Sequence, residues 1–148
     1  MTLEELELLR NPSALRLLEE LAEESPTDIA LRFRDGEIPG RLLATQIELR
    51  QRARRKLPAW VEAGCLFTRR AFEQATPEAI LSEKPISGSG IAIDLTGGLG
   101  VDVWKMAQSF DRVIYNDANP LLVALARFNL GRLGLHNVEF RNQQAEDL

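Results

Sequence analysis

The stretch that decides the fold is Ile91-Ala92-Ile93-Asp94-Leu95-Thr96-Gly97-Gly98-Leu99-Gly100-Val101-Asp102. Four of its first five residues are apolar and two of these are β-branched, which is typical of a buried strand. Three glycines follow within four positions, and from residue 101 to 110 apolar side chains recur at helical spacing. A strand, a glycine turn and a helix form the first half of a βαβ unit, so the sequence predicts an α/β fold with a parallel sheet.

Glycines in such a turn let the backbone approach a ligand where a Cβ atom would collide. The free N–H groups at the start of the next helix face the same place, at the carboxyl end of the strand. A tight turn without any ligand is the alternative, because a G-x-G pattern is weak evidence on its own.

A second acid supports the ligand interpretation. Asp111-Arg112-Val113-Ile114-Tyr115-Asn116-Asp117 is typical of a short strand that ends in a carboxylate, 20 positions after Gly97. A carboxylate there can accept hydrogen bonds from both ribose hydroxyls of an adenosine. The alternative is an exposed strand-end acid or a helix N-cap. Asn119 and Pro120 then predict a helix start, and residues 137–141 a third strand.

Composition bounds the remaining classes. The 148 residues suffice for one ordinary domain core, and no apolar run approaches the roughly 20 residues of a membrane span. The acidic N-terminus is unlike a signal peptide. One cysteine, Cys65, and one histidine, His136, are too few for an all-protein zinc site, so no metal is expected. A single cysteine fits a reducing, cytoplasmic location, with Cys65 as a packed residue.

The N-terminal region is predicted to be helical. Residues 3–9, 13–24 and 41–56 follow helical periodicity, and a short helix is expected at 29–33. Thr76, as N-cap before Pro77, predicts another short helix. The turn-rich segment 82–90 suggests a boundary between a helical domain, 1–85, and a sheet domain, 86–148.

Charge is spread unevenly along the chain. Residues 32–70 carry ten Lys and Arg against four Asp and Glu, whereas the whole chain has a net charge of −4. The candidate nucleic-acid contacts are Arg50, Arg52, Arg54, Arg55 and Lys56, with base stacking by Trp60 as a further hypothesis. A solvated basic helix end and a Trp packed in the core are the alternatives.

The glycine turn lacks the third glycine of a dinucleotide fingerprint, since Val103 stands in its place. Asp94-Leu95-Thr96-Gly97-Gly98-Leu99-Gly100 instead resembles motif I of class I S-adenosylmethionine (SAM) methyltransferases. Together with Lys56-Leu57-Pro58-Ala59-Trp60 and the helix at 126–135, it resembles a bacterial group of these enzymes with a helical N-terminal region and a THUMP-like C-terminal domain.

The resemblance implies a Rossmann-like SAM-binding sheet, SAM as cofactor, and RNA as the substrate class. It assigns the methionine end of SAM to Asp94, Gly97, Gly98 and Gly100, with Thr96 and Asp102 beside them, the ribose to Asp117, and the adenine to Gln144. Gln144 stands where relatives often have an Asp, and its carbonyl accepts a hydrogen bond less strongly than a carboxylate.

The resemblance also implies more strands than the three that this chain supplies. We therefore expect a truncated sheet, no assignable catalytic residue and little activity of this chain alone. The first strand would be an exposed edge, which favours homo-oligomers. Two alternatives stay open: a nonenzymatic module that binds nucleic acid or protein through residues 50–56, and a fragment of an NAD-binding oxidoreductase.

Overall fold

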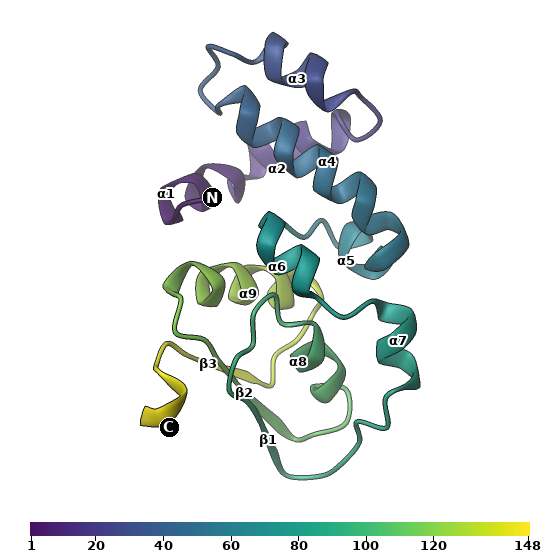
Figure 1. Ribbon diagram of the computed structural model, residues 1–148, viewed down its shortest axis with the longest axis vertical. Coiled ribbons are helices and arrows are strands. Elements are labelled where there is room, and N and C mark those ends of the chain that lie inside the picture. Colours follow the sequence, from purple (N-terminus) through teal and green to yellow (C-terminus); the bar gives the residue numbers. More distant parts are fainter. The chain divides into compact units, whose positions relative to one another are not determined.

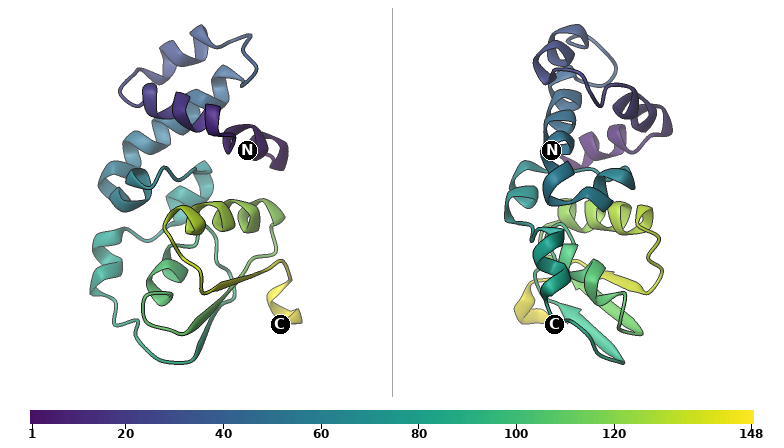
Figure 2. Two further views of the ribbon diagram at one scale, coloured as in Figure 1. Left: turned by 180° about the vertical axis from the view of Figure 1, so that it is seen from behind. Right: turned by 90° about the vertical axis from the view of Figure 1, so that its right-hand side faces the viewer.

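The computed structural model describes all residues, Met1–Leu148. The chain forms two compact units, Met1–Phe72 and Glu73–Leu148, and each is described by itself (Figures 1 and 2). None of the helices has the length and apolar character that crossing a membrane requires.

The first unit is helical. Its helices are α1 (Leu3–Leu9), α2 (Pro12–Glu20), α3 (Pro26–Arg32), α4 (Gly40–Lys56) and α5 (Pro58–Glu62), and α6 (Arg69–Gln74) begins in it. The long α4 carries much of the core, with Leu43, Ile47 and Leu49 fully buried. Pro58 both ends α4 and opens α5, because proline lacks the N–H that a helix interior needs but fits a first turn. The sequence did not predict α5 or α6.

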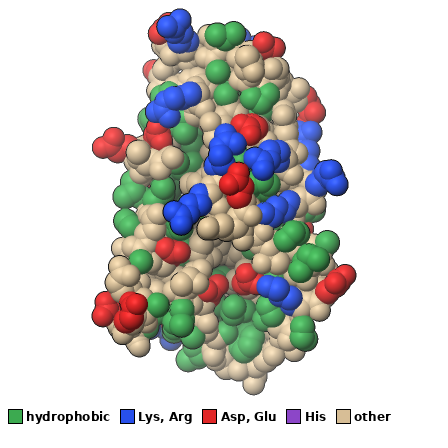
Figure 3. Space-filling view, in the orientation of Figure 1, with side chains coloured by type: hydrophobic (Ala, Val, Ile, Leu, Met, Phe, Trp, Pro, Cys, Tyr) green, Lys and Arg blue, Asp and Glu red, His purple; other side chains and the backbone are tan.

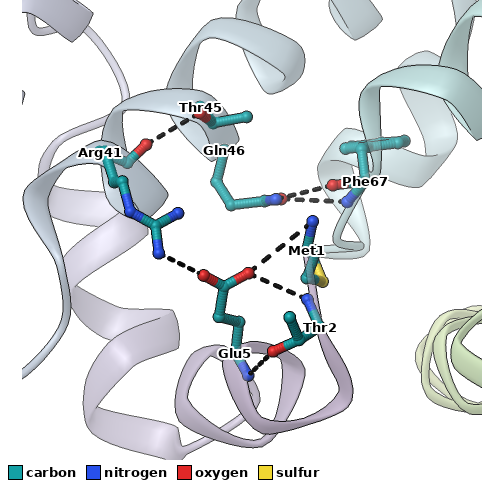
Figure 4. A network of polar contacts seen from close by, with 7 residues as sticks. All are labelled: Met1, Thr2, Glu5, Arg41, Thr45, Gln46 and Phe67. Atoms are coloured by element: carbon teal, nitrogen blue, oxygen red, sulfur yellow. Dashed lines mark hydrogen bonds and ion pairs between the residues drawn. The ribbon is translucent and has the colours of Figure 1, made fainter.

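A polar network fastens α1 and α4 inside this unit (Figure 4). Thr2 and Glu5 form a capping box at the start of α1, and Arg41 of α4 pairs with Glu5. The hydrogen bond from Arg41 holds the pKa of the Glu5 carboxyl below its usual value.

The buried Gln46 amide of α4 donates to the Phe67 carbonyl at 2.7 Å and accepts from the Phe67 N–H at 3.0 Å. Both ends of the buried Gln46 amide are thereby satisfied.

The second unit is a parallel sheet with helices between its strands. Its elements are α7 (Glu78–Glu83), β1 (Ile91–Asp94), α8 (Val101–Met106), β2 (Arg112–Asn116), α9 (Pro120–Arg132), β3 (Val138–Arg141) and the 3-10 turn η1 (Ala145–Asp147). The strand order is β1-β2-β3. Asp94, Tyr115 and Phe140 stand side by side in the register. The predicted α/β class with three parallel strands is confirmed.

The two crossovers place α8 and α9 on the same face of the sheet, because right-handed crossovers that progress in one direction add helices on one side. Val113 and Tyr115 of β2 are fully buried on that face, together with Val103 of α8. The opposite face is open, and Ile91 and Ile93 of β1 are 64% and 45% exposed. The strand predicted at 91–95 forms at Ile91–Asp94 and lies at an edge of the sheet, as the truncated sheet implied. The prediction that it is buried is wrong, because its isoleucines are exposed.

The segment before β1 also differs from expectation. Thr76 does not cap α7; the helix begins at Glu78 with Pro77 as its N-cap. The Thr76 hydroxyl instead lies 3.5 Å from the Asp102 carboxylate of α8. Because α7 packs against α8, residues 73–85 lie with the sheet unit, although the sequence placed the boundary after residue 85.

Candidate functional site

The candidate site is built on the turn from Gly97 to Gly100, between β1 and α8. Gly98 and Gly100 adopt left-handed φ angles of 52° and 96°, which favour glycine. The Gly97 N–H donates to the Asn116 carbonyl at 2.7 Å, and the Gly100 N–H donates to the Gly97 carbonyl at 2.8 Å. The turn is thus fastened to the end of β2 as well as to itself.

Tyr115 of β2 supports the turn from beneath. Its hydroxyl donates to the Gly98 carbonyl at 2.6 Å. Its ring fills the space beside Gly97, where an added Cβ atom would be 2.3 Å from the ring. Burial, together with the nearby carboxylates of Asp117 and Asp94, raises the pKa of the Tyr115 hydroxyl. The hydroxyl therefore stays protonated and remains a donor.

The buried Asn116 side chain joins the ends of all three strands. Its Nδ2 donates to the carbonyls of Leu95 and Gln143, both at 3.0 Å, and its Oδ1 accepts from the Gln143 N–H at 3.1 Å. Leu95 directly follows β1, and Gln143 lies two residues after β3. Asn116 thus holds the edge of the sheet where the candidate site lies.

Asp117 follows β2 and faces the glycine turn. Its Oδ2 accepts from the Gly98 N–H at 3.0 Å, and its Oδ1 accepts from the Asn119 N–H at 2.8 Å. The N-cap of α9 is Asn119, whose Oδ1 accepts from the Leu121 N–H at 3.0 Å, so Asp117 is not the cap. A carboxylate oxygen has room for a second hydrogen bond, so both oxygens can still accept from a ligand.

Asp94, at the end of β1, lies in an acidic environment. Its Oδ1 accepts from the Thr96 N–H at 3.1 Å. Burial raises the pKa of its carboxyl; the Asp102 and Asp117 carboxylates raise it further, and Lys84 opposes them. The Asp102 and Asp117 carboxylates therefore both lie within electrostatic range of Asp94, near the glycine turn.

The remaining predicted site residues are Asp102, Thr96 and Gln144. Asp102, the second residue of α8, forms an ion pair with Lys84 at 2.8 Å. Thr96 is exposed, and Gln144 is an exposed residue at the start of η1. The sequence analysis missed Tyr115, Asn116 and Lys84 as site residues. The position of Tyr115 and Asn116 just before a strand-end acid was an available signal, whereas nothing in the sequence singled out Lys84.

The basic segment at the end of α4 is largely engaged within its own unit. Arg50 is only 8% exposed, Arg54 pairs with Glu23, and Lys56 donates to the Phe72 carbonyl at 2.6 Å. Arg52 shares Glu48 with Arg69, whereas Arg55 is exposed. Figure 3 shows Lys and Arg side chains interspersed with acids over this unit.

Trp60 is fully buried. The hypothesis that it stacks on a base is therefore wrong, and the alternative of a Trp packed in the core is confirmed.

No family model matches the chain, and no curated protein is significantly similar to it in sequence. Among solved structures, the chain is similar to the crystal structure of a "putative methyltransferase" from Porphyromonas gingivalis W83, with a TM-score of 0.73 and 30% sequence identity. The match covers 88% of this chain and 34% of that protein, so the chain spans about a third of its structural relative. The chain thus shares the Rossmann-like α/β fold of this methyltransferase-like protein from Porphyromonas gingivalis.

Proposed function

We propose that the chain binds SAM at the glycine turn and supplies the cofactor-binding part of a methyltransferase. One observation carries the proposal: the Gly98 N–H donates to Asp117 Oδ2 at 3.0 Å. This contact brings together two features that the resemblance to motif I assigns to the cofactor. The glycine turn is assigned to its methionine end, and Asp117, at the end of β2, is assigned to its ribose. The methyltransferase likeness of the structural relative supports the same activity.

The chemistry of the site suits this cofactor. SAM carries a positive sulfonium and an ammonium, which the carboxylates of Asp94 and Asp117 would attract. The Asp117 oxygens have acceptor capacity left for ribose hydroxyls, and Gln144 offers a carbonyl for the adenine amino group. In methyl transfer, a nucleophilic acceptor attacks the methyl carbon as its bond to sulfur breaks, which leaves S-adenosylhomocysteine. Such a step depends mainly on positioning.

The test is calorimetric titration of the chain with S-adenosylhomocysteine, repeated on Asp117→Asn. The variant loses one of two carboxylate acceptors, so we expect its affinity to fall by about tenfold or more. Asp111→Asn is a matched control. Asp111 directly precedes β2, whereas Asp117 directly follows it, and the Asp111 Oδ2 also accepts a hydrogen bond from a glycine, the Gly90 N–H, at 2.9 Å. This control should bind normally.

Failure of the folded wild-type chain to bind would contradict the proposal. Protection of the fold by NAD and not by S-adenosylhomocysteine would favour the oxidoreductase alternative. The buried Val103, in place of the third fingerprint glycine, argues against that alternative.

RNA is the substrate class that we include in the proposal. The support is the number of basic residues at the end of α4 and in α6, namely Arg52, Arg55, Lys56, Arg69 and Arg70. Arg55 and Arg70 are exposed, so we expect the double variant Arg55→Ala/Arg70→Ala to weaken binding of a hairpin RNA. The slope of log affinity against log salt should fall by about 1.5. Arg10→Ala/Arg16→Ala is the control with the same charge change in the acidic region.

Unchanged RNA affinity in the Arg55/Arg70 variant would contradict the RNA part alone. RNA binding by a chain that does not bind S-adenosylhomocysteine would favour the nonenzymatic module. The same proposal includes a cytoplasmic location and self-association through β1. It also includes membership of the bacterial methyltransferase group that has a THUMP-like C-terminal domain. Their support is the buried Cys65, which forms no disulfide, the open strand edge and the motif resemblance.

A further inference from the structure

Lys84 lies beside the glycine turn, directly after α7. Its ammonium forms an ion pair with Asp102 Oδ1 at 2.8 Å, at the start of the helix that the turn opens. It also lies close enough to Asp94, at the end of β1, to lower the pKa of that carboxyl. Its side chain is 39% exposed, so it is accessible to a ligand while it contacts Asp102.

Negative charges outnumber positive ones around the glycine turn. The Asp102 and Asp117 carboxylates both act electrostatically on Asp94, and Lys84 is the one cation that acts on it. The amino-acid end of SAM or S-adenosylhomocysteine carries a carboxylate next to its ammonium. Carboxylates alone would attract the ammonium and repel the carboxylate, so a cation is needed for the second group.

We propose that Lys84 binds the α-carboxylate of the cofactor and that Asp102 is a positioning residue that holds the Lys84 ammonium. This inference rests on the proposed function. The Thr76 hydroxyl, 3.5 Å from Asp102 Oδ2, orients the carboxylate from its other side. Asp102 then acts through Lys84, in place of the direct role beside the cofactor that the motif resemblance implies.

The experiment compares two ligands that differ only in the carboxylate. These are S-adenosylhomocysteine and its decarboxylated analogue, in which a propylamine replaces the amino-acid portion. The wild-type chain should bind S-adenosylhomocysteine about tenfold more tightly, since a charge-assisted hydrogen bond is lost in the analogue. Lys84→Met should weaken binding of S-adenosylhomocysteine by a similar factor and leave affinity for the analogue unchanged. Lys84→Arg should keep the preference.

Lys105→Met, which removes a lysine from the last turn of α8, is the matched control and should also keep the preference. Asp102→Asn should reduce the preference in part, because Lys84 is then less well placed. The assignment would be overturned if Lys84→Met lowered the affinity for both ligands equally, or if this variant still bound S-adenosylhomocysteine more tightly than the analogue. If the folded wild-type chain binds neither ligand, the proposed function fails and the assignment with it. Thermal unfolding of each variant separates loss of folding from loss of binding.

Discussion

The ring of Tyr115 occupies the space that a side chain at Gly97 would need. A Cβ atom added to Gly97 would lie 2.3 Å from Cε2 and 2.4 Å from Cδ2 of the ring. Real Cβ atoms do not approach other atoms so closely, and the ring is fully buried and fixed by its hydroxyl on the Gly98 carbonyl. The glycine at this position is thus required by packing from below, independently of any ligand above it.

This contact predicts that Gly97→Ala destabilises the sheet unit by about 1–3 kcal/mol, the usual range for an overpacked core. Urea unfolding followed by circular dichroism measures the change. The comparison is Gly131→Ala in α9, where an added Cβ atom meets nothing within 4 Å. That variant should stabilise the chain by about 0.5–1 kcal/mol, because alanine is the better helix former. Equal effects of the two substitutions would contradict the packing argument.

The charge of Asp94 is predicted to oppose folding at neutral pH. Burial raises the pKa of this carboxyl in the folded chain above its ordinary 3.8. The folded state therefore binds the proton more tightly, and the free energy of unfolding falls as pH rises from about 3.8 through the folded pKa. Asp94→Asn keeps an Oδ1 acceptor for the Thr96 N–H and removes the charge. We expect its Tm to exceed that of the wild type by about 2–4 °C at pH 7 and to equal it near pH 3.

Glu48 supplies a control of opposite sign for that measurement. The hydrogen bond from Arg69 lowers the pKa of its carboxyl, so its contribution is present above the unfolded pKa and is lost as pH falls through the folded pKa. Glu48→Gln should lower the Tm at pH 7, by the equivalent of at most about 1 kcal/mol for so exposed a pair, and match the wild type at acid pH. If both variants moved the Tm in one direction at pH 7, the assignment of charge effects would be wrong.

Asn116 is predicted to be the most sensitive polar residue of the sheet unit. Asn116→Ala leaves two carbonyls and one N–H without their side-chain partner at the ends of β1 and β3. We expect a loss of about 3 kcal/mol or more in the free energy of unfolding, measured from the urea midpoint at constant m-value. Asn142→Ala, which removes one exposed hydrogen bond to the Asp117 carbonyl, should cost less than about 1 kcal/mol.

The free edge of β1 predicts self-association of this chain. Ile91 and Ile93 of β1, which has one unpaired side, are 64% and 45% exposed, and Leu95 directly after it is 47% exposed. Such apolar edges act as templates for further strands. Sedimentation should show a mass above 16.6 kDa that rises with concentration, and Ile93→Lys should return the chain to the monomer. Ile80→Lys, at a 51% exposed position on α7, should leave the association unchanged.

Local chemistry explains which features could be predicted from the sequence. Pro12, Pro26 and Pro120 begin helices because proline fits a first turn, and the glycine turn lies between a strand and a helix as its pattern predicts. The free edge of β1 followed from the truncated sheet, whereas the exposure of Ile91 and Ile93 was missed, because an apolar run indicates a strand without showing whether anything covers its face. The role of Tyr115 beneath Gly97 and the pairing of Lys84 with Asp102 depend on segments that only the folded chain brings together.

The two acids that flank β2 have a consequence for alignment of the sheet. Asp111 accepts from the Gly90 N–H before β1 begins, and Asp117 accepts from the Gly98 N–H after it ends. A parallel pair with only four matched positions is weakly protected against sliding. A slip of one residue would break both contacts together and turn the buried Tyr115 ring to the open face. The two contacts together thus favour the observed register, in which the glycine turn and Asp117 lie at the same level.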